Sequence, residues 1–116
     1  MTALYVALGG ALGAIGRYGI GLAVGYPWAT FSVNTIGSFA IGVIWVLLPA
    51  VGAGAHLPFL LTGLLGGFTT FSAFSLDTLR LIEDGKVFLA STYVVLSVVF
   101  SLGFCFLGLT VSRSFL

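Results

Sequence analysis

Long apolar runs alternate with short connectors along the whole chain. Apolar side chains dominate four stretches, 3–24, 30–51, 57–81 and 87–112. Each stretch reaches the roughly 20 residues, at about 1.5 Å of rise per residue, that an α-helix needs to cross the hydrocarbon layer of a membrane. The connectors hold prolines, glycines and most of the charges, and they are too short to form a soluble domain. The pattern therefore predicts an all-α membrane protein with one domain, residues 1–116, built from four transmembrane helices.

Charge gives only a weak indication of how these helices are oriented. With four spans, both termini lie on one side of the membrane, together with the 52–58 connector. Arg113 lies on that side, whereas Arg80 and Lys86 lie on the other. So small a difference in positive charge barely orients a membrane protein. Either the 82–86 loop faces the cytoplasm, or the chain inserts in both orientations.

Composition supports membrane insertion and argues against other classes of protein. Of the 116 residues, 59% are hydrophobic and 6% are charged, whereas soluble domains carry about 25% charged residues. The net charge of +1 argues against nucleic-acid binding, which needs clustered Lys and Arg. A single cysteine, Cys105, cannot form an intrachain disulfide. A signal peptide is the alternative interpretation of residues 1–24, but no basic segment precedes the apolar run, and Arg17 interrupts it.

Small residues on the first helix predict close packing between helices. Gly9 and Gly13 form a GxxxG pair, and Gly21 and Gly25 repeat it. Such residues let two backbones approach in lipid, where burial of apolar surface does not drive association. We expect this packing within one subunit at least. The polar side chains on the other helices outnumber those that four helices can shield, which favours a homo-oligomer.

Polar side chains recur at every fourth position of the second helix and therefore share one face. They are Thr30, Asn34 and Ser38. Asn34 is the costliest to place in hydrocarbon, because its amide offers two N–H donors and one carbonyl acceptor that all need partners. A hydrogen bond that merely joins two helices, worth about 0.6 to 2 kcal/mol, explains Asn34 as well as contact with a transported species does.

The fourth helix carries a similar stripe, formed by Tyr93, Ser97 and Ser101, with Cys105 next in line. The stripe drifts by about 40° per step, because four residues slightly exceed one helical turn. An isolated serine in a membrane helix usually bonds back to its own helix. Three hydroxyls in register instead indicate a track along which something small and polar moves.

The third helix contains the sequence GGFTTFSAFS at 66–75. The glycine pair predicts a break in the helix at Gly66–Gly67. Non-helical backbone at membrane depth is tolerated only where it is buried in protein or lines a wet cavity. A break frees carbonyl groups that can bind a cation and N–H groups that can face an anion. Phe71 and Phe74 share a helical face and can add the positive edges of their rings, so the combined donor set suits an anion.

These motifs resemble those of the small fluoride channel family, the CrcB or Fluc proteins. The resemblance extends over the whole chain and rests on GRY at 17–19, on T-x-x-x-N-x-x-G-S-F from 30 to 39, and on GGFTTFSAFSLD at 66–77. It implies an antiparallel, dual-topology homodimer, embedded in the lipid bilayer of the cell inner membrane, with two fluoride pathways along the subunit interface. The implied function is passive, fluoride-selective export from the cytoplasm, which lowers fluoride toxicity and is not enzymatic.

The resemblance also implies roles for individual residues. Asn34 would contact the ion through its amide, and Phe71 and Phe74 through their ring edges. Arg17 would lie near the vestibule of the pathway. The hydroxyl groups expected along the pathway are those of Thr30, Ser38, Thr70, Ser72, Tyr93, Ser97 and Ser101.

A structural Na⁺ ion at the centre of the dimer would be bound by backbone oxygens at the break, for which Gly66 and Thr69 match the family positions. The sequence also departs from the family pattern. Ala73 stands where a threonine is common, and Cys105 stands where a hydroxyl is often found, which puts in doubt a track that continues past the serines. Asp77 stands where glutamate is frequent, and no role is expected for it beyond that of a charge at a helix end or at the membrane interface.

Two other functions remain as alternatives. A small multidrug-type exporter also has four helices, but it needs a glutamate in the first helix, and residues 3–24 contain no acid. A non-transporting membrane subunit could use the polar stripes only to join helices, although that role does not call for two aromatic residues beside a broken helix. An enzyme is disfavoured, because His56 lies in a connector, away from the serines and from Asp77.

Overall fold

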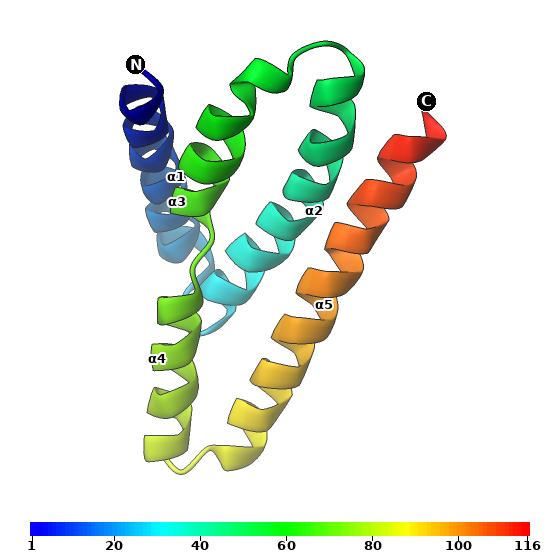
Figure 1. Ribbon diagram of the computed structural model, residues 1–116. Coiled ribbons are helices and arrows are strands. Elements are labelled where there is room, and N and C mark those ends of the chain that lie inside the picture. The colour runs from blue at the N-terminus through cyan, green and yellow to red at the C-terminus, as the bar shows by residue number, and fades with distance from the viewer.

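The computed structural model describes residues 1–116 and is entirely helical (Figure 1). The elements are α1 (Thr2–Val24), α2 (Trp28–Ala50), the 3-10 turn η1 (Gly54–His56), the π-helical segment η2 (Pro58–Leu65), α3 (Gly66–Phe68), α4 (Phe71–Glu83) and α5 (Val87–Ser114). Four helical segments are long and apolar enough to cross a membrane: Thr2–Val24, Trp28–Ala50, Gly54–Glu83 and Val87–Ser114. The expected all-α, multi-pass membrane architecture with an interrupted third span is thus confirmed. The dimeric part of that expectation stays a prediction.

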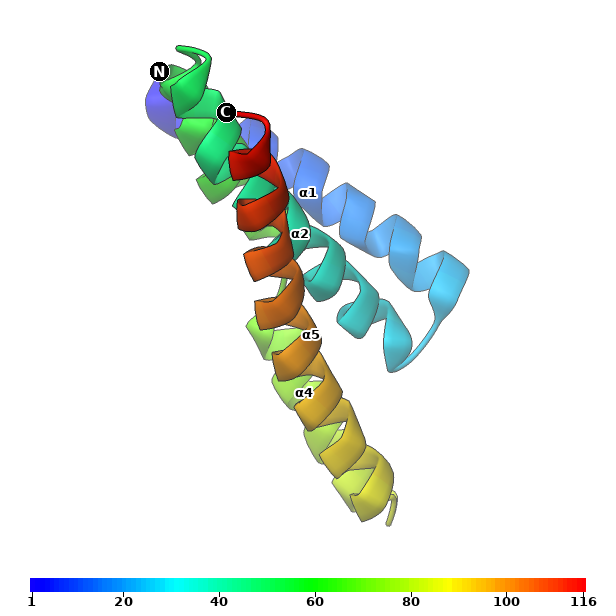
Figure 2. The ribbon, with the colours of Figure 1, turned by 90° about the vertical axis from the view of Figure 1, so that its right-hand side faces the viewer.

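The chain forms a thin slab rather than a closed bundle. Its extents are 51 × 32 × 20 Å. Helix α2 packs mainly against α5, α1 packs against η2 and α3, and α4 lies beside the first half of α5 (Figure 1). Both termini lie at the same end of the molecule, opposite the loop between α4 and α5 (Figure 2). Only 15 of the 116 residues are buried, so most apolar side chains face outward and are available to lipid or to another chain.

Glycines set the closest approaches between helices. A Cβ atom at Gly67 would lie 2.5 Å from the Gly10 carbonyl oxygen, and one at Gly9 would lie 2.6 Å from the Phe59 carbonyl oxygen. The expected close packing at the first GxxxG pair is therefore confirmed, and it occurs within one chain. A Cβ atom at Gly21, in the second pair, would meet no atom of another segment within 4 Å, so that pair makes no such approach inside the chain.

The break in the third span does not lie where the glycine pair predicted it. Gly66 and Gly67 are both helical, and the backbone becomes extended only at Thr69 (φ −85°, ψ 159°) and Thr70 (φ −155°, ψ 126°). The glycines serve the close approach to α1 instead. Threonine, whose branched Cβ favours extended backbone, occupies the break, and α4 begins at Phe71 directly after it.

Candidate functional site

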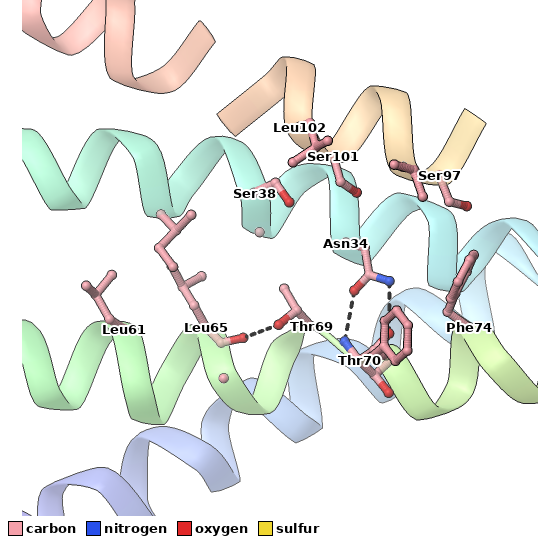
Figure 3. Close-up of a pocket in the computed structure, with 15 residues that line it drawn as sticks. Asn34, Ser38, Leu61, Leu65, Thr69, Thr70, Phe74, Ser97, Ser101 and Leu102 are labelled. Carbon is pink, nitrogen blue, oxygen red and sulfur yellow. Dashed lines mark hydrogen bonds between the residues drawn. The ribbon is translucent and has the colours of Figure 1, made fainter. Parts of the chain in front are cut away.

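A cavity of about 440 Å³ opens beside the break, between α2, the third span and α5 (Figure 3). It collects most of the residues that the sequence analysis singled out, and none of its lining residues is charged. The lining residues are Asn34, Gly37, Ser38, Ile41, Leu61, Leu65, Gly66, Thr69, Thr70, Phe71, Phe74, Ser97, Val98, Ser101 and Leu102. Thr30, Ser72, Tyr93, Arg17 and Cys105, all discussed from the sequence, lie outside this cavity.

Asn34 holds the break together through two hydrogen bonds (Figure 3). Its Nδ2 donates to the Thr70 carbonyl (2.9 Å), and the Thr70 N–H donates to its Oδ1 (2.8 Å). The side-chain amide therefore gives Thr70 the donor and acceptor that a neighbouring strand would supply. Asn34 does form the interhelical contact considered from the sequence, but this contact uses only one of its two amide hydrogens. The second amide hydrogen has no partner, and the residue lines the cavity.

The hydrogen bonds at the break remove the usual donors of two backbone carbonyl groups. In a continuous helix, the Thr70 N–H would bond to the Gly66 carbonyl and the Ala73 N–H to the Thr69 carbonyl. Here the first N–H bonds to Asn34, and the second donates to the Thr70 hydroxyl (3.1 Å), which caps α4. The Gly66 and Thr69 carbonyls have therefore lost their helical partners beside an open cavity.

Ser97 and Ser101 bring hydroxyls from α5 to the side of the cavity occupied by Asn34 and Ser38 (Figure 3). The Ser97 Oγ is buried and has no hydrogen-bond partner, which costs about 1 to 3 kcal/mol for a polar group. Other hydroxyls of α5 bond back to their own helix: that of Ser91, for example, donates to the Val87 carbonyl (3.0 Å). Ser97 does not, so its hydroxyl is an unpaired group in the wall of the cavity.

The two phenylalanines of α4 form one end of the cavity. The rings of Phe71 and Phe74 are 5.5 Å apart between centroids and tilted by 45°. Phe74 packs on Tyr93, again at 5.5 Å. Phe71 is 78% exposed, so its own chain leaves most of that ring uncovered.

Tyr93 and Asp77 form a buried pair behind these rings. The Tyr93 hydroxyl donates to Asp77 Oδ2 (3.1 Å), and both residues are buried. The expectation that Asp77 is a charge at a helix end or at the membrane interface is wrong, because α4 continues to Glu83 and the carboxylate faces α5. The two residues are 16 positions apart on different helices, and no local pattern in the sequence links them. The place of Tyr93 in a hydroxyl track stays a prediction.

A second cavity, of about 400 Å³, lies between α1, α2 and the break. It is lined by Arg17, Tyr18, Gly21, Leu22, Ala29, Thr30, Val33, Thr70 and Ala73. Arg17 Nε donates to the Gly67 carbonyl (3.1 Å), which fixes the guanidinium near the break. Thr70 lines both cavities, and its Oγ1 lies 3.3 Å from that of Ser72. The Thr30–Asn34–Ser38 stripe is thus divided between two cavities, with Thr70 between them.

Comparisons with known proteins agree with the sequence motifs. The model of a family described as "CrcB-like protein, Camphor Resistance (CrcB)" matches residues 4–109. Proteins named fluoride-specific ion channel FluC are similar over nearly their full length. That of Paracoccus denitrificans is 54% identical and covers 97% of this chain and 94% of its own. Those of Rhodospirillum centenum and Allorhizobium ampelinum are 46% and 49% identical and cover 96% and 95% of this chain, respectively, and 94% of their own. The resemblance inferred from the motifs is confirmed.

Proposed function

This chain belongs to the CrcB-like protein family, and we propose that it is a fluoride-selective ion channel of a bacterial plasma membrane. Fluoride would leave the cytoplasm passively, which lowers its toxicity. The observation that carries this proposal is the uncharged cavity at the break, which is lined by Asn34 and by the hydroxyl-bearing side chains of Ser97 and Ser101. Efflux of fluoride from liposomes that contain the purified protein tests the proposal directly.

The chemistry of the cavity suits a small anion that holds water strongly. A pore must replace the hydration shell of such an ion with short, well-directed donors. Asn34 supplies an N–H, Ser97 and Ser101 supply hydroxyls, and the rings of Phe71 and Phe74 can supply positive edges. Because no charged side chain lines the cavity, the ion would not be held too tightly to leave, and conduction requires release as well as binding.

Arg17 gives the second cavity the character expected of a vestibule. Its guanidinium is the only charged group among the residues that line this cavity, and a cation at the entrance of a low-dielectric passage raises the local concentration of anions. Thr70, which lines both cavities, lies where an ion would pass from one to the other.

A single chain leaves the pathway incomplete, and we propose that an antiparallel homodimer encloses it. The chain is 20 Å across its thinnest dimension, and the cavity at the break is open at the surface. The Phe71 ring is 78% exposed, although it belongs to the expected pathway. A second copy related by a twofold axis would cover these surfaces and create two equivalent pathways, because a twofold interface uses the same surface on both subunits.

Dual topology predicts two populations of the chain in cells. His56 is exposed in the short segment between α2 and η2, so a cysteine at this position, in a Cys105→Ser background, reports which side the connector faces. We expect a membrane-impermeant thiol reagent to label about half of the protein in intact cells, because the small charge difference barely orients the chain, and to label all of it after permeabilisation. Labelling that is all or none before permeabilisation would refute dual topology.

The break also fits a structural Na⁺ ion. Unwound backbone carbonyls coordinate Na⁺ in other membrane proteins, and the Gly66 and Thr69 carbonyls have lost their helical donors here. Two carbonyls from one chain are too few ligands for a hard cation, so the same two groups of a second subunit would complete the site. When bound, the ion would join the two broken helices and neutralise their carbonyl dipoles.

Removal of sodium is therefore expected to weaken the dimer. In detergent, exchange of Na⁺ for N-methylglucamine should shift the protein toward monomer on size exclusion and lower its melting temperature, and re-addition of Na⁺ should reverse both effects. In liposomes, fluoride efflux should fall in parallel. An equal melting temperature and an unchanged dimer in both buffers would argue against a structural sodium ion.

The structure gives no support to the alternative of a proton-coupled exporter. Its acid would have to be Asp77, since α1 contains none, and that carboxylate is engaged by the Tyr93 hydroxyl outside the cavity. A subunit that only joins helices would have no use for an uncharged cavity that collects polar side chains of α2 and α5 beside a broken helix.

A further inference from the structure

The loop between α1 and α2 makes a two-point contact with α4 through Tyr26. The Tyr26 hydroxyl donates to the main-chain carbonyl of Asp77 (3.3 Å). The Arg80 guanidinium carbon lies 4.2 Å from the centroid of the Tyr26 ring, which is the geometry of a cation–π interaction. Asp77 and Arg80 are three residues apart and share one face of α4, so a single side chain holds two successive positions on that face.

Helix α4 has few other attachments to the first half of the molecule. The extended residues Thr69 and Thr70 separate it from α3, and α1 makes no close contact with it. Its packing is mostly against α5, through Leu81, Ala90 and Tyr93. Because a helix after a break can rotate about its axis more easily than a continuous helix, the contacts of Tyr26 have a large influence on how α4 is placed.

The contacts of Tyr26 are connected, through Asp77 and Tyr93, to the Phe74 ring that lines the cavity. Asp77, whose carbonyl accepts from Tyr26, also accepts the Tyr93 hydroxyl through its carboxylate. Phe74 lies one turn earlier on α4 and packs on Tyr93. Trp28, two residues after Tyr26, meets the same Tyr93 ring edge-on, at 5.8 Å. Tyr26 and Tyr93 thus both hold α4 at Asp77.

We propose that Tyr26 is a positioning residue that fixes the rotation of α4, and with it the placement of the Phe71 and Phe74 rings beside Asn34. The inference rests on the proposed function, because the rings matter only if an ion passes them. Tyr26 itself lies outside both cavities and acts through α4. Its loss should therefore change how well the pathway distinguishes anions, in addition to any change in the amount of folded protein.

The experiment compares Tyr26→Leu with Tyr26→Phe, which keeps the ring under Arg80, and with Tyr5→Leu as a matched control. Tyr5 is an exposed tyrosine of α1 without a side-chain hydrogen bond. Two quantities are measured on reconstituted protein: the ratio of fluoride to chloride efflux, and the rate of amide hydrogen exchange in residues 71–83. Both efflux rates are corrected for the leak from protein-free vesicles, so their ratio does not depend on how many channels assemble, and a loss of folded protein alone leaves it unchanged.

We expect Tyr26→Leu to lower the fluoride-to-chloride ratio by about tenfold, as a misplacement of about 1 Å can do, and to speed exchange in α4. Tyr26→Phe should retain most of the wild-type ratio, and Tyr5→Leu should match the wild type in both measurements.

If Tyr26→Leu does not assemble, the same two measurements are made on Arg80→Gln, which removes the charge above the ring, with the same expected results. A wild-type ratio and wild-type exchange in the variant that assembles would overturn the proposal. If the unmodified protein showed no preference for fluoride, the proposed function would fail, while the exchange measurement would still decide whether Tyr26 holds α4.

Discussion

Replacing Asn34 with alanine is expected to abolish fluoride conduction and to weaken the third span at the same time. The substitution removes both hydrogen bonds to Thr70 and leaves an N–H and a carbonyl without partners at membrane depth. Each unsatisfied group costs about 1 to 3 kcal/mol. The substitution also removes the second amide hydrogen, which has no partner within the chain and belongs to a residue that lines the cavity. We expect fluoride efflux to fall by about a hundredfold or more, by analogy with the loss of one directed donor from an anion-stabilising site in an enzyme.

Asn34→Asp keeps the acceptor of this side chain and removes its donor. A carboxylate still accepts the Thr70 N–H, but it offers no N–H to the Thr70 carbonyl or to an anion. The aspartate variant keeps one of the two hydrogen bonds at the break and places a negative charge beside the cavity, so it should conduct no fluoride. Ser91→Ala serves as the control for loss of a polar group, because the Ser91 hydroxyl is exposed and bonds only to its own helix. Conduction by Asn34→Ala within about twofold of the wild type would reduce Asn34 to a residue that only joins helices.

Phe71→Ile is expected to lower fluoride efflux by about tenfold or more while leaving the amount of assembled protein unchanged. In the single chain the Phe71 ring is 78% exposed, and its only aromatic neighbour is Phe74, so the fold of one chain depends little on it, and isoleucine still fills the proposed subunit interface. Isoleucine keeps an apolar side chain of similar volume, but it removes the ring edge and its positive hydrogens. Efflux is measured with a fluoride electrode and normalised to the dimer recovered from size exclusion.

Two further variants make the result specific. Phe74→Ile should also lower efflux, and it should reduce stability as well, because that ring packs on Tyr93. Phe88→Ile, at an equally exposed phenylalanine at the start of α5 (87% exposed), should leave efflux unchanged. If Phe71→Ile and Phe88→Ile behaved alike, ring edges would have no part in permeation.

The sequence predicted the spans well, because the length of an apolar run is set by the thickness of the membrane alone. The sequence pattern also predicted correctly that certain polar residues lie close together in space. Asn34 and Ser38, from one stripe, and Ser97 and Ser101, from another, line the same cavity. Helical periodicity is enough to place such residues on one face, and a polar face in an apolar helix must turn toward protein or water.

The sequence could not predict features that depend on what lies across from a residue. The glycine pair predicted the break in the third span. Gly67 is instead a glycine because the Gly10 backbone lies too close for a larger side chain. Thr30 looked equivalent to Asn34 and Ser38, but the stripe turns around α2, and Thr30 lines the other cavity. Asp77 looked like a charge near the membrane surface, but Tyr93 reaches it from another helix. The interpretations of the glycine pair and of Asp77 failed because the deciding contact comes from a distant part of the chain, whereas the place of Thr30 in the pathway stays a prediction.

Efflux from liposomes loaded with equal concentrations of fluoride and chloride tests the central claim most directly. If uncharged donors at the broken helix replace the water around fluoride, purified protein should empty the vesicles of fluoride rapidly and without a proton gradient once a K⁺ ionophore lets K⁺ follow, while chloride stays inside. Vesicles that retained fluoride, or that lost both anions at the same rate, would contradict the account.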